Sequence, residues 1–137
     1  ILLSDEDRLN IKMTKLPGGG VEFGEGSELA LKREWMEELG VEIQVGNIFY
    51  VNPFLQVSAF DPKDEIVAMY FWVRPLATPK VAISTQAFDF VKGQGEQQSF
   101  RWKAIKDLSE EDLTFPIDKA MTRELRKVDW EKMLRGI

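Results

Sequence analysis

The feature that most constrains the fold is a glycine-rich break followed by one segment of helix length. Residues 17–20 (PGGG) interrupt any regular element, and a helical pattern then runs from Ser27 to Gly40. Serine is a favoured residue at a helix N-terminus, and glycine commonly ends a helix in the left-handed conformation. The pattern therefore predicts a loop and a helix with defined ends between flanking strands.

The rest of the chain contains strand patterns and a second helical pattern. We expect strands at residues 1–4, 10–15, two or three within 41–60, 66–73 and 99–105, with a charged turn at 4–8. The run at 66–73 (IVAMYFWV) is almost wholly apolar, which predicts a central strand buried on both faces. A second helix is expected from Pro116 to about Arg135. This mixture predicts one α/β (α+β) domain spanning residues 1–137.

Composition narrows the chemistry that the chain can perform. The 137 residues include no Cys and no His, which excludes disulfides, thiol nucleophiles, imidazole metal sites and Ser-His-Asp triads. Acid–base or metal chemistry must therefore use Asp, Glu, Lys, Tyr or water.

Charge and hydropathy indicate which partners to expect. The 18 Lys and Arg residues are outnumbered by 23 Asp and Glu residues, which argues against binding a nucleic-acid duplex. No apolar run approaches the roughly 18 residues of a membrane span. We therefore expect a cytoplasmic protein that binds neither a nucleic-acid duplex nor a membrane, and self-association as a homodimer stays open.

A helical wheel separates three carboxylates from the apolar side of the helix over residues 27–39. Glu34, Glu37 and Glu38 lie within one turn, opposite an arc formed by Leu29, Leu31, Trp35, Met36 and Leu39. Like charges at these spacings repel by a few tenths of a kcal/mol. A solvated acidic face would account for them, and so would a magnesium site, because Mg²⁺ prefers hard oxygen ligands.

Residues 19–41 resemble the Nudix box, G-x5-E-x7-R-E-U-x-E-E-x-G-U, in which U is aliphatic. The matching positions are Gly19, Glu25, Arg33, Glu34, Trp35, Glu37, Glu38, Gly40 and Val41. Every spacing is met, and the departure is Trp35 at an aliphatic position. Because the wheel places Trp35 on the core side, we expect it to affect packing rather than chemistry.

The resemblance implies a fold and an activity. The fold is a Nudix-type α/β/α sandwich around a mixed β-sheet. One further strand is expected upstream of Ile1, or another segment in its place, because residues 1–3 would otherwise present an unpaired edge. The activity is that of a pyrophosphohydrolase, which cleaves the pyrophosphate linkage of a nucleoside diphosphate joined to another group with the help of Mg²⁺, or of Mn²⁺ in its place. The default substrate is a (d)NTP or another small nucleotide derivative.

The resemblance also implies roles for individual residues. Glu37 and Glu38 resemble direct metal ligands, and Glu34 resembles a further ligand or the general base. Arg33 would orient the glutamates, and an ordinary ion pair with Glu37 is compatible with that role. Lys15 could contact a phosphate, although a solvated strand lysine is the simpler interpretation.

Two loops complete the expected site. Gly18, Gly19 and Gly20 would give the backbone freedom to approach the ligand, and the Gly19 carbonyl would face the metal. Glu96 is the candidate general base in a later glycine-containing loop, where the alternative is a surface glutamate.

An alternative function remains at this stage. A Nudix-fold module without catalytic activity could bind a nucleotide or a protein partner. The presence of Glu34, Glu37 and Glu38 argues against it, since such a module has no need for three mutually repelling carboxylates.

Overall fold

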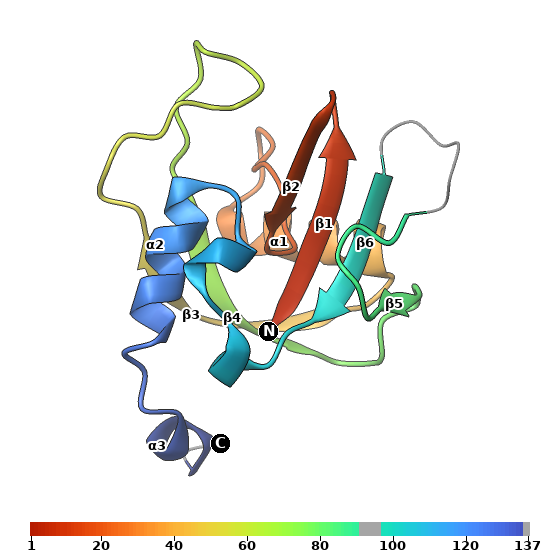
Figure 1. Cartoon of the computed structure of the whole chain (residues 1–137), viewed down its shortest axis with the longest axis vertical. Helices are drawn as coiled ribbons and strands as arrows, with labels where there is room; N and C mark the ends of the chain where they lie inside the picture. The colour runs from red at the N-terminus through yellow and green to blue at the C-terminus, as the bar shows by residue number, and fades with distance from the viewer. Residues whose placement is uncertain (91–96, 136–137) are drawn as a thin grey trace.

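The computed structural model describes residues 1–90 and 97–135 (Figure 1). The main sheet is mixed and has the strand order β2-β1-β6-β5, with β5 and β6 parallel and the other neighbours antiparallel. Its strands are β1 (Leu2–Arg8), β2 (Ile11–Lys15), β5 (Ile83–Ser84) and β6 (Gln97–Trp102). A separate antiparallel ribbon consists of β3 (Ile43–Val51) and β4 (Met69–Pro75). The helices are α1 (Ser27–Leu39), α2 (Pro116–Leu125) and α3 (Trp130–Arg135), with short 3-10 turns η1 (Ile105–Asp107) and η2 (Glu110–Asp112).

Helix α1 lies behind the main sheet in the view of Figure 1, and α2 lies to the left of that sheet, in front of β3 and β4. The two helices pack in different core clusters, which meet opposite faces of β1. Successive side chains of a strand point to opposite faces. Leu2 of β1 accordingly packs in the cluster that holds Trp35 and Leu39 of α1. Leu3 packs in the other cluster, with Met121 and Leu125 of α2. The predicted α/β/α sandwich around a mixed sheet is confirmed.

Strand β1 decides two expectations about the start of the chain. The prediction of a charged turn at residues 4–8 is wrong, because these residues form the second half of β1. The place beside residues 1–3 is filled by other segments of the chain, the second of the two expected alternatives, because β1 pairs with β2 on one side and with β6 on the other. The turn lies instead at Leu9 and Asn10, whose φ angles are 52° and 62°, as a two-residue hairpin loop requires.

Long-range partners explain why so charged a segment can be a central strand. Asp5 is fully buried, and its carboxylate lies 2.7 Å from Arg101 Nε of β6 and accepts a 2.6 Å hydrogen bond from the Thr14 hydroxyl of β2. A buried charge is tolerated when it is paired and hydrogen-bonded in this way.

The apolar run at residues 66–73 is not a central strand buried on both faces. Strand β4 begins at Met69 and pairs with β3 in the ribbon. The ribbon is apolar because it contributes to both cores: Val73 packs against the α1 cluster, and Trp72 packs against the α2 cluster. Continuous apolarity therefore arises here without a central position in the main sheet.

The C-terminal helical pattern is divided into two helices. Helix α2 ends at Leu125, and α3 begins at Trp130. The Asp129 carboxylate accepts a 3.0 Å hydrogen bond from the Lys132 amide, which satisfies a free donor at the start of α3. The Trp130 ring packs edge-on against Trp72 at 5.9 Å, so α3 is fixed against the ribbon. In the described part of the chain, every helix is too short or too polar to cross a membrane.

Candidate active site

Helix α1 carries the three carboxylates of the box, Glu34, Glu37 and Glu38, and has clear ends. The helix ends at Gly40, whose φ of 65° is left-handed and whose amide donates to the Met36 carbonyl at 3.0 Å. Its start is less well matched to the sequence pattern, because Gly26 rather than Ser27 is the capping residue. The side chains of the predicted apolar face are only partly buried. Trp35 and Leu39 are buried, but Leu29 and Met36 are exposed.

The three glutamates differ in their environments. The Glu37 side chain is 58% exposed, whereas that of Glu34 is 16% exposed. Glu38 is half-buried, and the charges of Glu34 on α1 and Glu6 on β1 act on it. Only Glu37 therefore matches the picture of a solvated acidic face.

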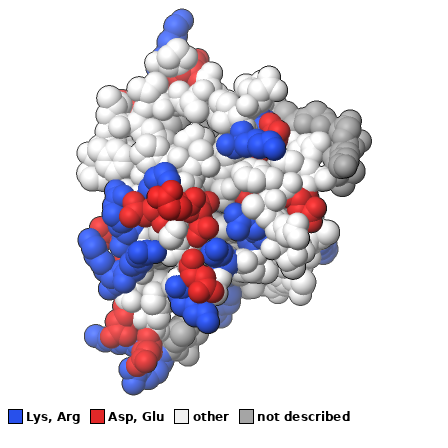
Figure 2. Space-filling model, in the orientation of Figure 1, with Lys and Arg blue, Asp and Glu red and all other residues white. Residues whose placement is uncertain are grey.

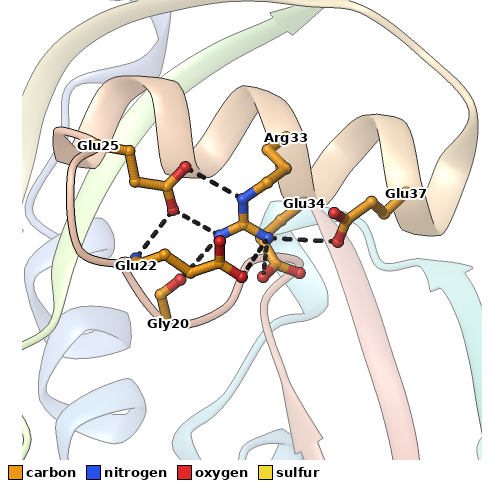
Figure 3. Close-up of polar contacts among 6 residues, drawn as sticks. All are labelled: Gly20, Glu22, Glu25, Arg33, Glu34 and Glu37. Carbon is orange, nitrogen blue, oxygen red and sulfur yellow. Dashed lines mark hydrogen bonds and ion pairs between the residues drawn. The ribbon is translucent and has the colours of Figure 1, made fainter.

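Arg33 forms hydrogen bonds and ion pairs both with the glycine loop and with glutamates of α1 (Figure 3). Its Nε and one terminal nitrogen contact the Glu25 carboxylate at 3.1 and 2.6 Å, and that nitrogen also donates to the Gly20 carbonyl at 3.0 Å. The other terminal nitrogen contacts Glu34 at 3.0 Å and Glu37 at 3.3 Å. These contacts raise the pKa of Arg33 and lower that of Glu25, so the guanidinium fixes both the loop and the helix side chains.

The glycine loop lies directly against Glu34. A Cβ atom added at Gly19 would come within 2.4 Å of the Glu34 carboxyl carbon, whereas one added at Gly20 would have no heavy atom within 4 Å. Gly18 has a φ of 147° that other residues rarely adopt. Of the three glycines, Gly19 is therefore the one whose lack of a side chain gives Glu34 its position.

The Glu38 carboxylate is the most perturbed acid of the helix. Its Oε2 atom is buried and has no hydrogen-bond partner among the described residues. Burial raises the pKa of Glu38 to about 7; a hydrogen bond from Gln98 opposes the rise, and the negative charge of Glu34 adds to it. A carboxylate in this state can take up a proton or bind a cation near neutral pH.

Comparison with known proteins identifies the family of this chain. A family model described as the NUDIX domain matches residues 2–125. The chain belongs to the Nudix family. A solved structure from work on MutT of the fish pathogen Aliivibrio salmonicida and of Vibrio cholerae is similar to it, with 20% sequence identity, a TM-score of 0.48, and coverage of 93% of this chain and 86% of that chain. A search of curated proteins gave no match.

Nudix hydrolases generally use divalent metals such as Mg²⁺, an ion that binds to hard oxygen ligands. In the described part of the chain, no three Asp or Glu side chains are gathered closely enough to hold a metal as they stand. The donor chemistry nevertheless fits: Glu34 and Glu38 are neighbouring carboxylates, and Glu38 Oε2 is buried without a partner among the described residues. A hard cation would satisfy that oxygen and remove the repulsion between the two carboxylates.

A large cavity begins at the Nudix glycine loop and extends to α2. Its volume is about 830 Å³, and apolar side chains form most of its wall. Lys15, Tyr70 and Asp118 are among its polar lining residues, whereas the three box glutamates are not part of the lining. Asp118 is 7% exposed, accepts a hydrogen bond from the Tyr70 hydroxyl, and has a pKa raised by burial.

Sequence reasoning missed part of this site. Glu6 and Gln98 both act on Glu38, yet the charged segment that contains Glu6 predicts a turn, and no local pattern marks Gln98. Alternation of Leu2, Ser4 and Glu6 on one face of a strand would have been the signal for Glu6. Glu96, the candidate general base, lies outside the described residues.

Proposed function

We propose that the chain is a Mg²⁺-dependent pyrophosphohydrolase that cleaves the phosphoanhydride linkage of a nucleoside diphosphate joined to another group. A (d)NTP or another small nucleotide derivative is the expected substrate. The observation that carries the proposal is the half-buried Glu38 carboxylate, whose Oε2 atom has no partner among the described residues and which lies under the influence of Glu34. Such an arrangement is unfavourable for the protein alone and becomes favourable when a cation binds.

In this proposal Glu34 and Glu38 would hold the metal, with Glu37 and the Gly19 carbonyl as further ligands. A metal held there would supply Lewis-acid chemistry to the phosphoryl oxygens and make water a better nucleophile. Arg33 keeps Glu34 and Glu37 oriented through its contacts at 3.0 and 3.3 Å. A box glutamate or Glu96 accepts the proton of the attacking water at a carboxylate oxygen.

The cavity supplies the binding site for the rest of the nucleotide. Its volume of about 830 Å³ and its mostly apolar wall are typical of small-molecule sites. Lys15 lines the cavity and pairs with Glu6 at 3.3 Å, so its ammonium group lies where a phosphate could meet it. The proposed catalytic unit is the whole chain, residues 1–137, acting as one domain.

One observation favours a second candidate, a Nudix-fold module that binds a nucleotide without cleaving it. Arg33 already engages Glu34 and Glu37, so these carboxylates are partly neutralised by the protein itself. A module of this kind would bind nucleotides in the cavity in the absence of metal.

A substrate panel separates the two functions. Purified protein is incubated with (d)NTPs, nucleotide sugars and dinucleoside polyphosphates, with Mg²⁺ or with a chelator, and released phosphate or pyrophosphate is measured. Mg²⁺-dependent release that Glu38→Gln abolishes supports the hydrolase. Nucleotide binding without turnover on any substrate, equal with Mg²⁺ and with chelator, supports the binding module and contradicts the hydrolase.

A further inference from the structure

The cavity reaches the first turn of α2, where two polar residues belong to its mostly apolar wall. Asp118 lies in the first turn of α2, and Gln56 comes from the segment between β3 and β4. Both residues line the cavity, and Asp118 is nine-tenths buried. Lys15 and the glycine loop belong to the same lining, so one continuous space joins this polar pair to the start of the Nudix box.

The Gln56 amide has a fixed orientation. Its Oε1 atom accepts a 3.0 Å hydrogen bond from the backbone amide of Ile117, one of the N–H groups that have no acceptor within a helix. A backbone N–H can only donate, so the oxygen of the side-chain amide faces Ile117 and the NH₂ group is at the other end. That NH₂ group has no acceptor among the described residues and is not enclosed by protein atoms. Gln56 therefore has free donors next to the residue that precedes Asp118.

The Asp118 carboxylate has one bonded oxygen and one free oxygen. Oδ1 accepts a hydrogen bond from the Tyr70 hydroxyl of β4. Oδ2 has no donor in residues 1–90 and 97–135, and it is not enclosed by protein atoms either. Because Asp118 lines the cavity, this oxygen is open to a ligand there. Burial raises the pKa of Asp118, and a ligand N–H at Oδ2 would stabilise the ionised form.

A free acceptor close to a free donor selects one kind of nucleobase edge. The ligand must donate a hydrogen to Asp118 and accept one from Gln56. Guanine, hypoxanthine, uracil and thymine have this pattern in their lactam edge, a ring N–H beside a C=O group. Adenine and cytosine have the reverse pattern, a ring nitrogen with a lone pair beside an NH₂ group. With these two bases the carboxylate would face a lone pair and the amide would face another donor, and polar groups that are buried unpaired are costly.

We propose that Asp118 and Gln56 are specificity-determining residues that bind the lactam edge of a nucleobase, so that the chain selects guanine, hypoxanthine, uracil or thymine nucleotides over adenine and cytosine nucleotides. The inference rests on the proposed function in one respect, that the cavity is the place where the nucleotide binds. A hydrogen bond to a charged group changes affinity by about 10–100-fold, which sets the size of the expected preference.

Inosine and adenosine are a matched pair of probes for this preference. Hypoxanthine has the lactam edge, adenine has the reverse pattern at the same positions, and neither nucleoside carries a phosphate that would involve a metal. Dissociation constants are measured by ligand-observed NMR titration in chelator. We expect the wild-type protein to bind inosine about 10–100-fold more tightly than adenosine.

Two variants each change one member of the polar pair. In Asp118→Asn the amide oxygen can keep the Tyr70 hydroxyl, so the NH₂ group faces the cavity and meets the lactam N–H with another donor. In Gln56→Glu one oxygen can keep the Ile117 amide, so an acceptor replaces the donor that the lactam C=O requires. Both variants should lose the preference for inosine. Gln44→Glu is the control, because Gln44 is an exposed glutamine of β3, and it should keep the wild-type preference.

The inference is overturned if the wild type binds the two nucleosides equally, prefers adenosine or binds neither. It is also overturned if a folded Asp118→Asn or Gln56→Glu protein keeps the preference for inosine. Melting curves show which variants are folded, and either one suffices for the test.

The substrate panel keeps this failure distinct from failure of the proposed function. Mg²⁺-dependent phosphate release that Glu38→Gln abolishes, without a preference for inosine, leaves the hydrolase standing and removes only the role of Asp118 and Gln56. A preference for inosine without release from any substrate supports that role and removes the hydrolase.

Discussion

Replacing Glu38 by glutamine should stabilise the metal-free protein while removing most of its activity. Burial raises the pKa of Glu38 from the usual 4.5 to about 7, so the folded protein holds the ionised form at a cost. A shift of this size corresponds to about 3 kcal/mol for a fully buried group. Because the side chain is only partly buried, we expect solvent screening to reduce the gain in Glu38→Gln to about 1–2 kcal/mol, or about 3–6 °C in melting temperature.

The gain should depend on pH in a defined direction. A folded-state pKa above the unfolded value means that the native protein binds the Glu38 proton more tightly than the unfolded chain does. The contribution of Glu38 to stability is therefore greatest below pH 4.5 and declines as the pH rises to about 7. Glutamine does not titrate, so the stability difference between variant and wild type should be small near pH 5 and reach its full size above pH 7.

Metal should reverse the order of stability. Mg²⁺ that binds the folded wild type stabilises it by about 2.7 kcal/mol at a concentration one hundred times the dissociation constant, and the variant should lose most of this increment. Turnover should fall by about a thousandfold if a metal contribution near 4 kcal/mol is lost.

The assay is calorimetric melting of both proteins at pH 5 and pH 8, in chelator and in Mg²⁺, together with turnover on the best substrate of the panel. Glu42→Gln is the control, because Glu42 is an exposed carboxylate close to the C-terminal end of α1. A Glu38→Gln protein that is less stable than wild type at pH 8 in chelator, or whose advantage is the same at pH 5 and pH 8, would refute the reasoning.

Two other pairs of variants test the loop and the cavity. Gly19→Ala should fold but displace Glu34, because the added Cβ would meet the flexible end of that side chain at 2.4 Å. In a Mn²⁺ titration its affinity should fall by about tenfold. Gly20→Ala is the control: the added Cβ has open space around it, so this variant should bind Mn²⁺ as the wild type does. Asp118→Asn should raise the melting temperature at neutral pH. Burial raises the pKa of Asp118 in the folded protein, so the stability of the wild type declines as the pH rises above the pKa that this carboxyl has in the unfolded chain. Tyr70→Phe should instead destabilise by about 1–3 kcal/mol, because the Asp118 carboxylate loses its hydroxyl donor. Melting curves between pH 4 and pH 8 check both, and a destabilised Asp118→Asn or a neutral Tyr70→Phe would contradict the assigned costs.

Local signals made helix α1 and its loop predictable. Helical periodicity and the glycine at position 40 located the helix to within one residue of its observed end, and the fixed spacing of the box identified the family that the NUDIX match confirms. These features depend on residues that are near one another in the chain.

Long-range partners account for most of what was missed. The buried Asp5 in β1 is paired with Arg101, and no local pattern reveals that a charge in a charged segment has a partner so far along the chain. The raised pKa of Glu38 likewise depends on burial against the sheet and on Gln98 of β6. Periodicity gives the direction of a side chain on its own helix, but not the element that will cover it.

The contacts of Arg33 determine how a charged substrate must arrive. All five N–H donors of a guanidinium are available for hydrogen bonds, and five bonds from Arg33 already go to Glu25, Glu34, Glu37 and the Gly20 carbonyl. The group has therefore no donor left for a phosphate, and its one positive charge is surrounded by several carboxylates. Four carboxylates lie within ion-pair distance of this one positive charge, so we expect the box to repel a free polyphosphate. Added salt should then accelerate the encounter of metal-free nucleotide with this protein, the reverse of electrostatic steering. Under the proposed function, we expect the productive nucleotide to arrive with its cation already bound.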